Sequence, residues 1–378
     1  MGTLRLLLAF AVASEHSPFG PLPGFGFLAA STAVQVFFII SGFFITMVIN
    51  ENESYKSVRA FYASRYLRLY PMYIVCALVT LSLNQANPYS FKGSPGSYFD
   101  YFALLGGSSQ AFILFSNLTI FLQDWFLFLQ VSPGAGTLDF TPAFNQGSMP
   151  PVYAFLWIAQ GWSLGIELVF YLLAPFVVRK PLRLLILVGI GFVSRYVTAR
   201  YFGEMTDPWY YRFVVSEMAL FGLGGLAYHC YARYAPLQRI AAQAGAAALA
   251  IAVVIVAFRQ FLGSLQPAFG QAIPVLNIYD PLLLAFMIVF VPAIFAFTRK
   301  NAFDRYVGEL SYPVYLTQVG IAAALSPWSE GDKILGSLTY AVSILLVSGI
   351  LLLIVDKPVT RLRAKRFGAG GMLESKTT

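Results

Sequence analysis

The chain has 378 residues, of which 58% are hydrophobic and only 11% charged, and its formal net charge is +8. Soluble domains carry roughly 25% charged residues, so this composition excludes an ordinary soluble domain and indicates a polytopic membrane protein. A charge of +8 could suggest nucleic acid as a partner, but the positive residues follow the predicted loops and therefore report topology. Cys76 and Cys230 lie in or beside apolar runs, so neither a disulfide framework nor a metal cluster is expected.

Apolar runs of the length needed to cross a bilayer, about 20 residues, recur along the whole chain. With a cytoplasmic N-terminus they predict an all-α bundle of ten spans, at residues 3–17, 28–49, 70–83, 152–176, 182–199, 213–231, 240–258, 277–298, 307–325 and 336–355. This arrangement puts 19 of the 25 Lys and Arg residues on the inner side, as the positive-inside rule requires. Both termini are then cytoplasmic, and residues 1–356 form one transmembrane domain followed by a basic cytoplasmic tail at 357–378.

Two stretches leave alternatives open. Residues 99–131 are apolar, but one extra crossing there would invert every later loop, so we expect outer-face helices, a re-entrant element or a hairpin, in that order. Residues 131–151 are rich in Gly, Pro, Thr and Ser and predict an external loop. The apolar run at 6–12 resembles a secretory signal, but a following span and the position of His16 favour a retained helix.

His16 is one of only two histidines in the chain and lies eleven residues after Arg5. Eleven helical steps return to within about 20° of the same face and rise roughly 16 Å. Arg5 is therefore predicted at the membrane surface and His16 well inside. An ionisable residue within the membrane marks a functional site by default, and histidine exchanges protons near neutral pH. His229 lies at a predicted inner helix end and is not expected to be catalytic.

Gln35, Gly42 and Thr46 fall on one narrow face of the second predicted span. The face predicts either a polar site or close helix packing, because small and hydroxylated residues are enriched where membrane helices meet.

Arg65 and Arg68 share a face of a segment that resembles an interfacial amphipathic helix, just before Pro71 opens the third span. Snorkelling and positive-inside bias would explain the two arginines. Alternatively, their guanidinium groups bind the phosphates of a cytoplasmic ligand, which arginine does better than lysine. An acyl-coenzyme A would supply such phosphates.

Ser163, Glu167 and Tyr171 are spaced four residues apart and so stack along one helix face. Glu167 is the strongest membrane-embedded carboxylate, and it is predicted to orient a histidine, pair with an arginine or hold its own proton. A structural polar lock is the alternative. Asp124 and Glu217 are weaker candidates of the same kind.

A second polar face occurs late in the chain, where Ser311, Tyr315 and Gln318 follow an i, i+4, i+7 pattern. Asp356, next to Lys357 and Pro358, is explained by a helix end. No catalytic triad, phosphate-binding glycine loop, zinc spacing or dinucleotide fingerprint occurs, so catalysis would have to be assembled from scattered intramembrane polar groups.

Five short motifs occur in order along nearly the whole chain. They are Arg5-x10-His16, FFIISGFF at 37–44, Arg65-Tyr-Leu-Arg68 with Pro71, Trp162-Ser-Leu with Glu167, Phe170 and Tyr171, and Ser311-Tyr-Pro-Val-Tyr315-Leu. In this order and spacing they resemble the acyltransferase-3 family, integral membrane O-acyltransferases of cell-surface glycans and of some lipids or antibiotics.

The resemblance implies a multi-pass protein of the inner membrane that moves an acyl group, most readily acetyl, from acyl-CoA to a hydroxyl of a lipid-linked or nascent envelope glycan or a glycolipid. It implies His16 and Glu167 as catalytic residues, His16 being either a general base or a transient acyl acceptor. Donor-binding residues would be Arg5, Arg65, Arg68, Ser41 and Gly42. Acceptor-binding residues would be Gln35, Trp162, Ser163, Tyr171, Tyr315 and Gln318. Acetyl-CoA is a substrate here, and neither a metal nor a permanently bound cofactor is expected.

The sequence also departs from the family pattern. Many relatives have histidine where this chain has Gln318, and Glu-x-Pro where it has Asp356-Lys357-Pro358. The sequence ends without the hydrolase-like domain fused to some members, so we expect direct delivery of the acyl group or its transfer to a partner. Two other classes stay open from the residues alone: a transporter or flippase, and a glycan polymerase or ligase.

Overall fold

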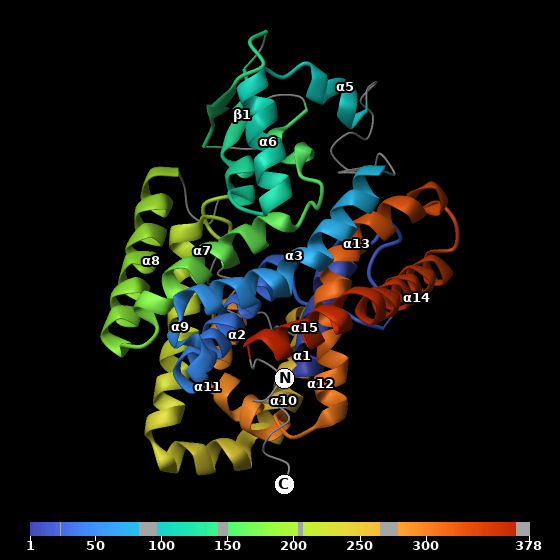
Figure 1. Ribbon diagram of the computed structural model, residues 1–378. Helices are drawn as coiled ribbons and strands as arrows, with labels where there is room; N and C mark the ends of the chain where they lie inside the picture. Colours follow the sequence, from blue (N-terminus) through green and yellow to red (C-terminus); the bar gives the residue numbers. More distant parts are fainter. Residues whose placement is uncertain are drawn as a thin grey trace.

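The computed structural model describes residues 1–22, 24–82, 97–132, 134–142, 150–202, 207–264 and 279–367. These residues form a helical bundle with one small hairpin (Figure 1). The main elements are α1 (Gly2–Glu15), α2 (Ala30–Glu51), α3 (Val58–Ser82), α5 (Tyr98–Ala103), α6 (Gly107–Thr119), β1 (Leu129–Val131), β2 (Leu138–Phe140), α7 (Gly161–Val177), α8 (Pro181–Phe202), α9 (Val214–Arg233), α10 (Ala235–Ser264), α11 (Tyr279–Thr298), α12 (Ala302–Glu309), α13 (Ser311–Leu325), α14 (Lys333–Leu351) and α15 (Lys357–Phe367). Short 3-10 turns occur at Glu53–Lys56, Gln123–Leu127, Val152–Phe155 and Ser326–Trp328, and a π-helical segment at Leu352–Asp356 joins α14 to α15.

Each of the ten predicted spans overlaps a helix, but the bounds differ: α7 begins only at Gly161 within 152–176, and 307–325 is divided between α12 and α13. The ends at 83 and 277–278 lie outside the described residues. Five helices of the described chain are long and apolar enough to cross a membrane: Ala30–Glu51, Pro181–Phe202, Ala235–Gln260, Pro281–Thr298 and Lys333–Phe367. The all-helical membrane class is thus confirmed, whereas the count of ten spans and the cytoplasmic termini stay predictions. One reason is length, because the 14 residues of α1 cover only about 21 Å.

Helices α2 and α9 pack together at the centre of the bundle through glycines. A Cβ atom on Gly42 would lie 2.0 Å from the carbonyl oxygen of Phe221, and one on Gly224 would lie 2.0 Å from that of Ile39. Only glycine allows two backbones to approach this closely. The small residues of the second predicted span therefore serve helix packing, one of the two alternatives left open by the sequence.

The predicted ambiguous segment 99–131 builds a lobe at one end of the bundle, at the top of Figure 1. It contains α5, α6, the turn Gln123–Leu127 and strand β1. With 13 residues, α6 extends about 20 Å and is too short to span. The lobe thus consists of short helices, as in the first of the three alternatives.

The hairpin lies in the same lobe. Strands β1 and β2 pair antiparallel, with Leu129 opposite Phe140 and Val131 opposite Leu138. The predicted loop 131–151 therefore contains a short hairpin, and its positions 133 and 143–149 lie outside the described residues.

Helix α3 corrects the expectation that Pro71 opens a new span. The helix runs without a break from Val58 to Ser82, with Pro71 inside it. Membrane helices tolerate proline because neighbouring groups satisfy the freed backbone atoms, and near this position the Tyr312 hydroxyl donates to the Leu69 carbonyl over 2.8 Å. The segment that carries Arg65 and Arg68 is therefore the first half of a bundle helix.

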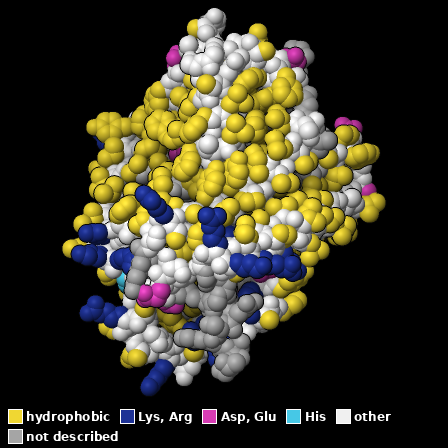
Figure 2. Space-filling model, in the orientation of Figure 1, with side chains coloured by type: hydrophobic (Ala, Val, Ile, Leu, Met, Phe, Trp, Pro, Cys, Tyr) yellow, Lys and Arg dark blue, Asp and Glu magenta, His cyan; other side chains and the backbone are white. Residues whose placement is uncertain are grey.

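One end of the bundle collects the start of α1, the ends of α2 and α9, the first half of α3, and α12 and α15; we call it the basic face. The Tyr228 hydroxyl on α9 donates to Glu51 at the end of α2 over 3.0 Å. Arg363 on α15 donates to the Ser64 carbonyl on α3 over 2.9 Å. Lys and Arg gather toward this end, below a broad hydrophobic band (Figure 2).

Asp304 fixes the first turn of α1 at the basic face. Its carboxylate accepts hydrogen bonds from the backbone amides of Gly2 at 2.7 Å and Thr3 at 2.9 Å. Burial by itself would raise the pKa of Asp304, but hydrogen bonds from the amino terminus and from these amides outweigh it and lower the pKa. A carboxylate at a helix N-terminus also offsets the helix dipole, so the position of Arg5 one turn later is well defined.

Candidate active site

His16 lies immediately after the last helical residue of α1 and is half-buried. This corrects the expectation of a position within the helix, well inside the bundle. Its Nδ1 lies 2.8 Å from the Val12 carbonyl oxygen, and because a carbonyl only accepts, Nδ1 carries the proton. In the neutral ring the Nε2 nitrogen then holds the lone pair, which is what a general base or an acyl acceptor requires.

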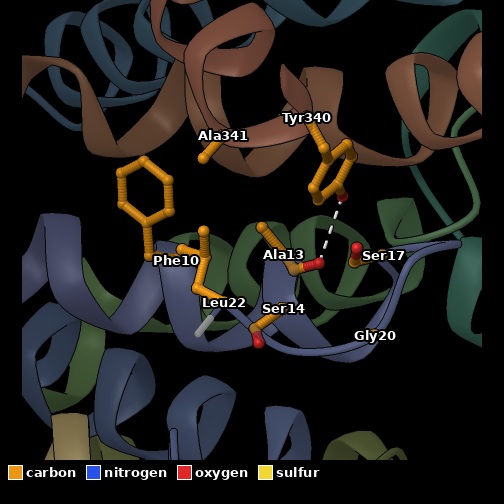
Figure 3. A pocket seen from close by; sticks show the side chains of 8 residues that line it. All are labelled: Phe10, Ala13, Ser14, Ser17, Gly20, Leu22, Tyr340 and Ala341. Atoms are coloured by element: carbon orange, nitrogen blue, oxygen red, sulfur yellow. Dashed lines mark hydrogen bonds between the residues drawn. The ribbon is translucent and has the colours of Figure 1, made fainter. Parts of the chain in front are cut away.

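Helix α14 holds the turn that carries His16. The Tyr340 hydroxyl lies 3.1 Å from the Ala13 carbonyl oxygen and 3.2 Å from that of Gln318, and its proton bonds one of them at a time. Figure 3 shows the first of these bonds beside a pocket of about 210 Å³, part of it open to solvent, between the end of α1 and α14. Phe10, Ser14 and Tyr340 line this pocket. Tyr340 thereby ties the end of α1 to α13.

Glu167 is held by hydroxyl groups from two helices. Ser41 on α2 donates to Oε1 over 3.0 Å, and Tyr171, one turn along α7, donates to the same oxygen over 2.5 Å. Glu167 also interacts electrostatically with Arg5. The predicted stacking of Glu167 with Tyr171 is confirmed. The carboxylate is thus held by hydroxyl donors, and Arg5 acts on it through electrostatics without a direct ion pair among the described residues.

Ser163 and Tyr315 form a second polar group between α7 and α13. Their hydroxyl oxygens lie 2.7 Å apart, and the Gln160 amide nitrogen donates to the Tyr315 carbonyl over 2.5 Å. The side chain of Gln318 is fully buried, and neither its nitrogen nor its oxygen has a hydrogen-bond partner. A buried amide left unpaired costs about 1–3 kcal/mol, so Gln318 fits a place where a polar ligand atom or water binds.

Trp162 packs against a charged group at the end of the bundle opposite the basic face. The Arg212 guanidinium lies 4.7 Å from the centre of the Trp162 ring, Tyr211 meets the same ring edge-on at 5.7 Å, and Arg212 pairs with Asp207 at 2.8 Å. Burial raises the pKa of Asp207, and its pairing with Arg212 opposes that effect only in part. Arg212 also interacts with Tyr315, which connects this group to the Ser163–Tyr315 group.

Gln35 belongs to a different cluster. Its amide donates to the buried carboxylate of Glu217 over 3.3 Å, and Arg195 on α8 pairs with the same carboxylate at 2.7 Å. Glu217 and Asp124 are both almost fully buried. Gln35 and Gly42 thus face α9, and packing explains both residues.

Arg65 and Arg68 lie on α3 at the basic face. Arg65 donates to the Tyr55 hydroxyl over 3.3 Å, and its guanidinium lies 5.8 Å from the Phe61 ring. Arg68 interacts electrostatically with Arg5. The structure therefore brings three predicted donor-binding arginines, Arg5, Arg65 and Arg68, to the same end of the molecule as Glu167.

Several residues at these groups were missed by the sequence analysis: Gln160, Asp207, Arg212, Tyr340 and Arg363. Of these, only Arg363 had a usable signal, since residues 357–367 carry no glycine or internal break and are rich in good helix formers. The others are positioned by tertiary contacts with no local pattern.

The polar groups connect the two ends of the bundle. Tyr315 interacts electrostatically with Arg212 on one side and Glu167 on the other, and Glu167 interacts with Arg5, which neighbours Arg68. These polar side chains lie within electrostatic reach of one another, one group after the next, between the lobe end and the basic face.

The fold and the site together define the class of this protein: a membrane-embedded helical bundle with polar groups in its interior. A sequence profile described as an acyltransferase domain matches residues 3–354. The chain belongs to this acyltransferase-3 family, and its five motifs fall within the matched range. No curated protein and no solved structure matches the chain.

Proposed function

We propose that this membrane acyltransferase moves an acyl group, most readily acetyl, from acyl-CoA to a hydroxyl of an envelope glycan or glycolipid. The observation that carries the proposal is the placement of the arginines and the imidazole at opposite ends of α1. A donor with phosphates at one end and a thioester at the end of a long flexible arm fits this separation of roughly 16 Å.

His16 acts on the acceptor in the proposed reaction. Its Nε2 takes the proton of the acceptor hydroxyl while that oxygen attacks the thioester carbonyl carbon. The carbon–sulfur bond breaks, and the proton passes from Nε2 to the sulfur, so that free CoA leaves. In the alternative, Nε2 attacks the thioester carbonyl carbon first, the carbon–sulfur bond breaks and CoA leaves as its thiolate. The acceptor oxygen then attacks the acyl carbon, the bond to Nε2 breaks, and the hydroxyl proton goes to the thiolate or to solvent.

The remaining residues of the site bind the donor or the acceptor, or support the residues that do. Arg5, Arg65 and Arg68 hold the donor phosphates. Glu167 partly offsets the positive charge of Arg5 and fixes the orientation of the Ser41 and Tyr171 hydroxyl groups. The acceptor is held by the groups around Trp162, Ser163, Tyr315 and Gln318, whose unpaired amide suits a sugar hydroxyl. Gln35 and Gly42 support the site through α9.

The test is to incubate the purified protein in lipid nanodiscs with radiolabelled acetyl-CoA and lipid-linked glycan. We expect label to enter the glycan with release of one CoA per acetyl group. Movement of the glycan across the membrane, or growth of its chain, without CoA release would instead identify a transporter or a polymerase.

The proposal also sets the orientation, with the basic face in the cytoplasm of an inner-membrane protein. In a variant with Cys76 and Cys230 replaced by alanine, we introduce Ser108→Cys in the lobe or Ser57→Cys at the basic face; both serines are exposed. In intact spheroplasts an impermeant maleimide should label the cysteine at 108, and label the cysteine at 57 only after permeabilisation. The reverse pattern would contradict this orientation.

A further inference from the structure

Arg363 brings a fourth guanidinium to the basic face from a distant part of the sequence. Residues 357–367, expected as the start of a basic tail, form helix α15, which lies against α3. Arg363 is the one cationic side chain of this helix that is buried, with 6% of its surface exposed. Burial of a charged guanidinium costs free energy unless hydrogen bonds or an opposite charge compensate it.

The protein partners of Arg363 satisfy only part of its hydrogen-bonding capacity. Its Nε donates to the Ser64 carbonyl over 2.9 Å, and Nη2 donates to the Ser64 hydroxyl over 3.3 Å. The Ser64 hydroxyl lies 2.7 Å from that of Tyr55, which in turn accepts from Arg65. Arg363 and Arg65 are therefore joined through two hydroxyl groups, and a guanidinium has five N–H donors.

Arginine side chains of the basic face lie within electrostatic reach of one another. The interactions of Arg363 with Arg68 and Arg65 are larger than its attraction to Asp356. In the same way, the interaction of Arg5 with Arg68 is larger than its attraction to Glu167. Of the described carboxylates, Asp356 acts on Arg363 and Glu167 acts on Arg5, but neither forms a direct ion pair with these arginines in the described residues.

A buried hydrogen-bond donor without a partner also indicates that an anionic ligand binds here. The Nε–H of Arg65 is buried and has no hydrogen-bond partner. Such a group costs free energy unless a ligand or water accepts its hydrogen. Guanidinium forks bind phosphate oxygens in pairs, which makes a ligand with several phosphates the best match to several adjacent arginines.

We propose that Arg363 completes the phosphate site of the donor, so that α3 and α15 together bind the nucleotide end of acyl-CoA. This inference rests on the proposed function, because it assigns a further residue to the same donor. The last described helix of the chain is then part of the enzyme's binding site, and donor binding ties α15 to α3.

The experiment compares Arg363→Gln with a matched control, Arg361→Gln, which removes the same charge from an exposed position of the same helix. Binding of CoA to the full chain is measured by calorimetry in nanodiscs of zwitterionic lipid. We expect Arg363→Gln to weaken CoA binding by about ten-fold or more, since it removes charge-assisted hydrogen bonds, while Arg361→Gln stays within about two-fold.

A phosphate-free donor separates ligand contact from a structural role. With acetyl-CoA, Arg363→Gln should raise KM and leave the KM for the acceptor unchanged. With the acetyl thioester of N-acetylcysteamine, which has no phosphates, turnover should equal that of the unmodified protein. Equal losses with both donors would mean that Arg363 only supports the fold and would overturn the inference.

The same titration in nanodiscs with anionic lipid distinguishes the source of the phosphate, and two further outcomes separate the inference from the proposed function. If the loss of CoA affinity occurs only in nanodiscs with anionic lipid, the arginines bind lipid headgroups, and the inference is wrong. If the unmodified protein itself does not bind CoA, the proposed function fails. If it binds CoA and Arg363→Gln binds equally well, the inference alone fails.

Discussion

Replacement of His16 by alanine should lower the rate of acyl transfer by about 100- to 10,000-fold, the usual contribution of a positioned general base. The expectation rests on the bond from Nδ1 to the Val12 carbonyl, which leaves the lone pair on Nε2. Removal of the ring takes away the only described group at the end of α1 that can both accept and return a proton near neutral pH. The measurement is single-turnover transfer of labelled acetyl to the glycan in nanodiscs.

Two controls accompany this variant. Ser17→Ala changes a neighbouring polar residue and should keep the rate within about two-fold, as expected of a substitution that removes no catalytic group. The thermal midpoint of His16→Ala should match that of the unmodified protein, because His16 is half-buried and ends its helix. Full transfer activity in a folded His16→Ala protein would remove His16 from the mechanism.

The same reaction separates the two roles of His16. Unmodified protein quenched after mixing with acetyl-CoA, without acceptor, is analysed by mass spectrometry. An acetyl adduct on the peptide containing His16, absent from the alanine variant, supports a transient acyl carrier. Rapid transfer on later addition of acceptor, with no adduct beforehand, supports a general base.

The sequence predicted the features that depend on local spacing. Apolar runs of about 20 residues located the long helices of the bundle, because burial of the backbone in lipid requires continuous helices. The four-residue spacing placed Tyr171 on Glu167, and this pair is bonded in the structure. Arg65 and Arg68 were predicted on one helical segment, and both lie on α3. These inferences need only the geometry of one helix.

Features that depend on which helices meet were beyond the sequence. Glu167 could have paired with any cation, and only the fold places it with Arg5 near the start of α1. Gly42 was predicted among the donor-binding residues, and only the fold shows that its space is filled by the carbonyl of Phe221 on α9. Arg363 looked like one more basic residue of a tail, and its burial follows from the docking of α15 on α3.

Replacement of both Arg65 and Arg68 by glutamine should weaken acyl-CoA binding by at least about 100-fold, because each charge-assisted hydrogen bond to phosphate contributes about 1.5–3 kcal/mol. Glutamine keeps part of the side-chain stem, although it removes the guanidinium that lies over the Phe61 ring. The KM for the acceptor should not change, because the acceptor groups around Trp162 lie at the other end of the bundle. Donor binding by calorimetry and both KM values check this prediction.

The matched control is Arg59→Gln, an exposed arginine of the same helix, which should change donor affinity by less than about two-fold. Added salt gives a second readout, since ionic strength screens charge contacts of this kind. Donor affinity of the unmodified protein should fall as salt rises, and that of the double variant should fall less. Unchanged donor affinity in the double variant would place the phosphates elsewhere, whereas parallel losses for donor and acceptor would indicate that α3 itself had shifted.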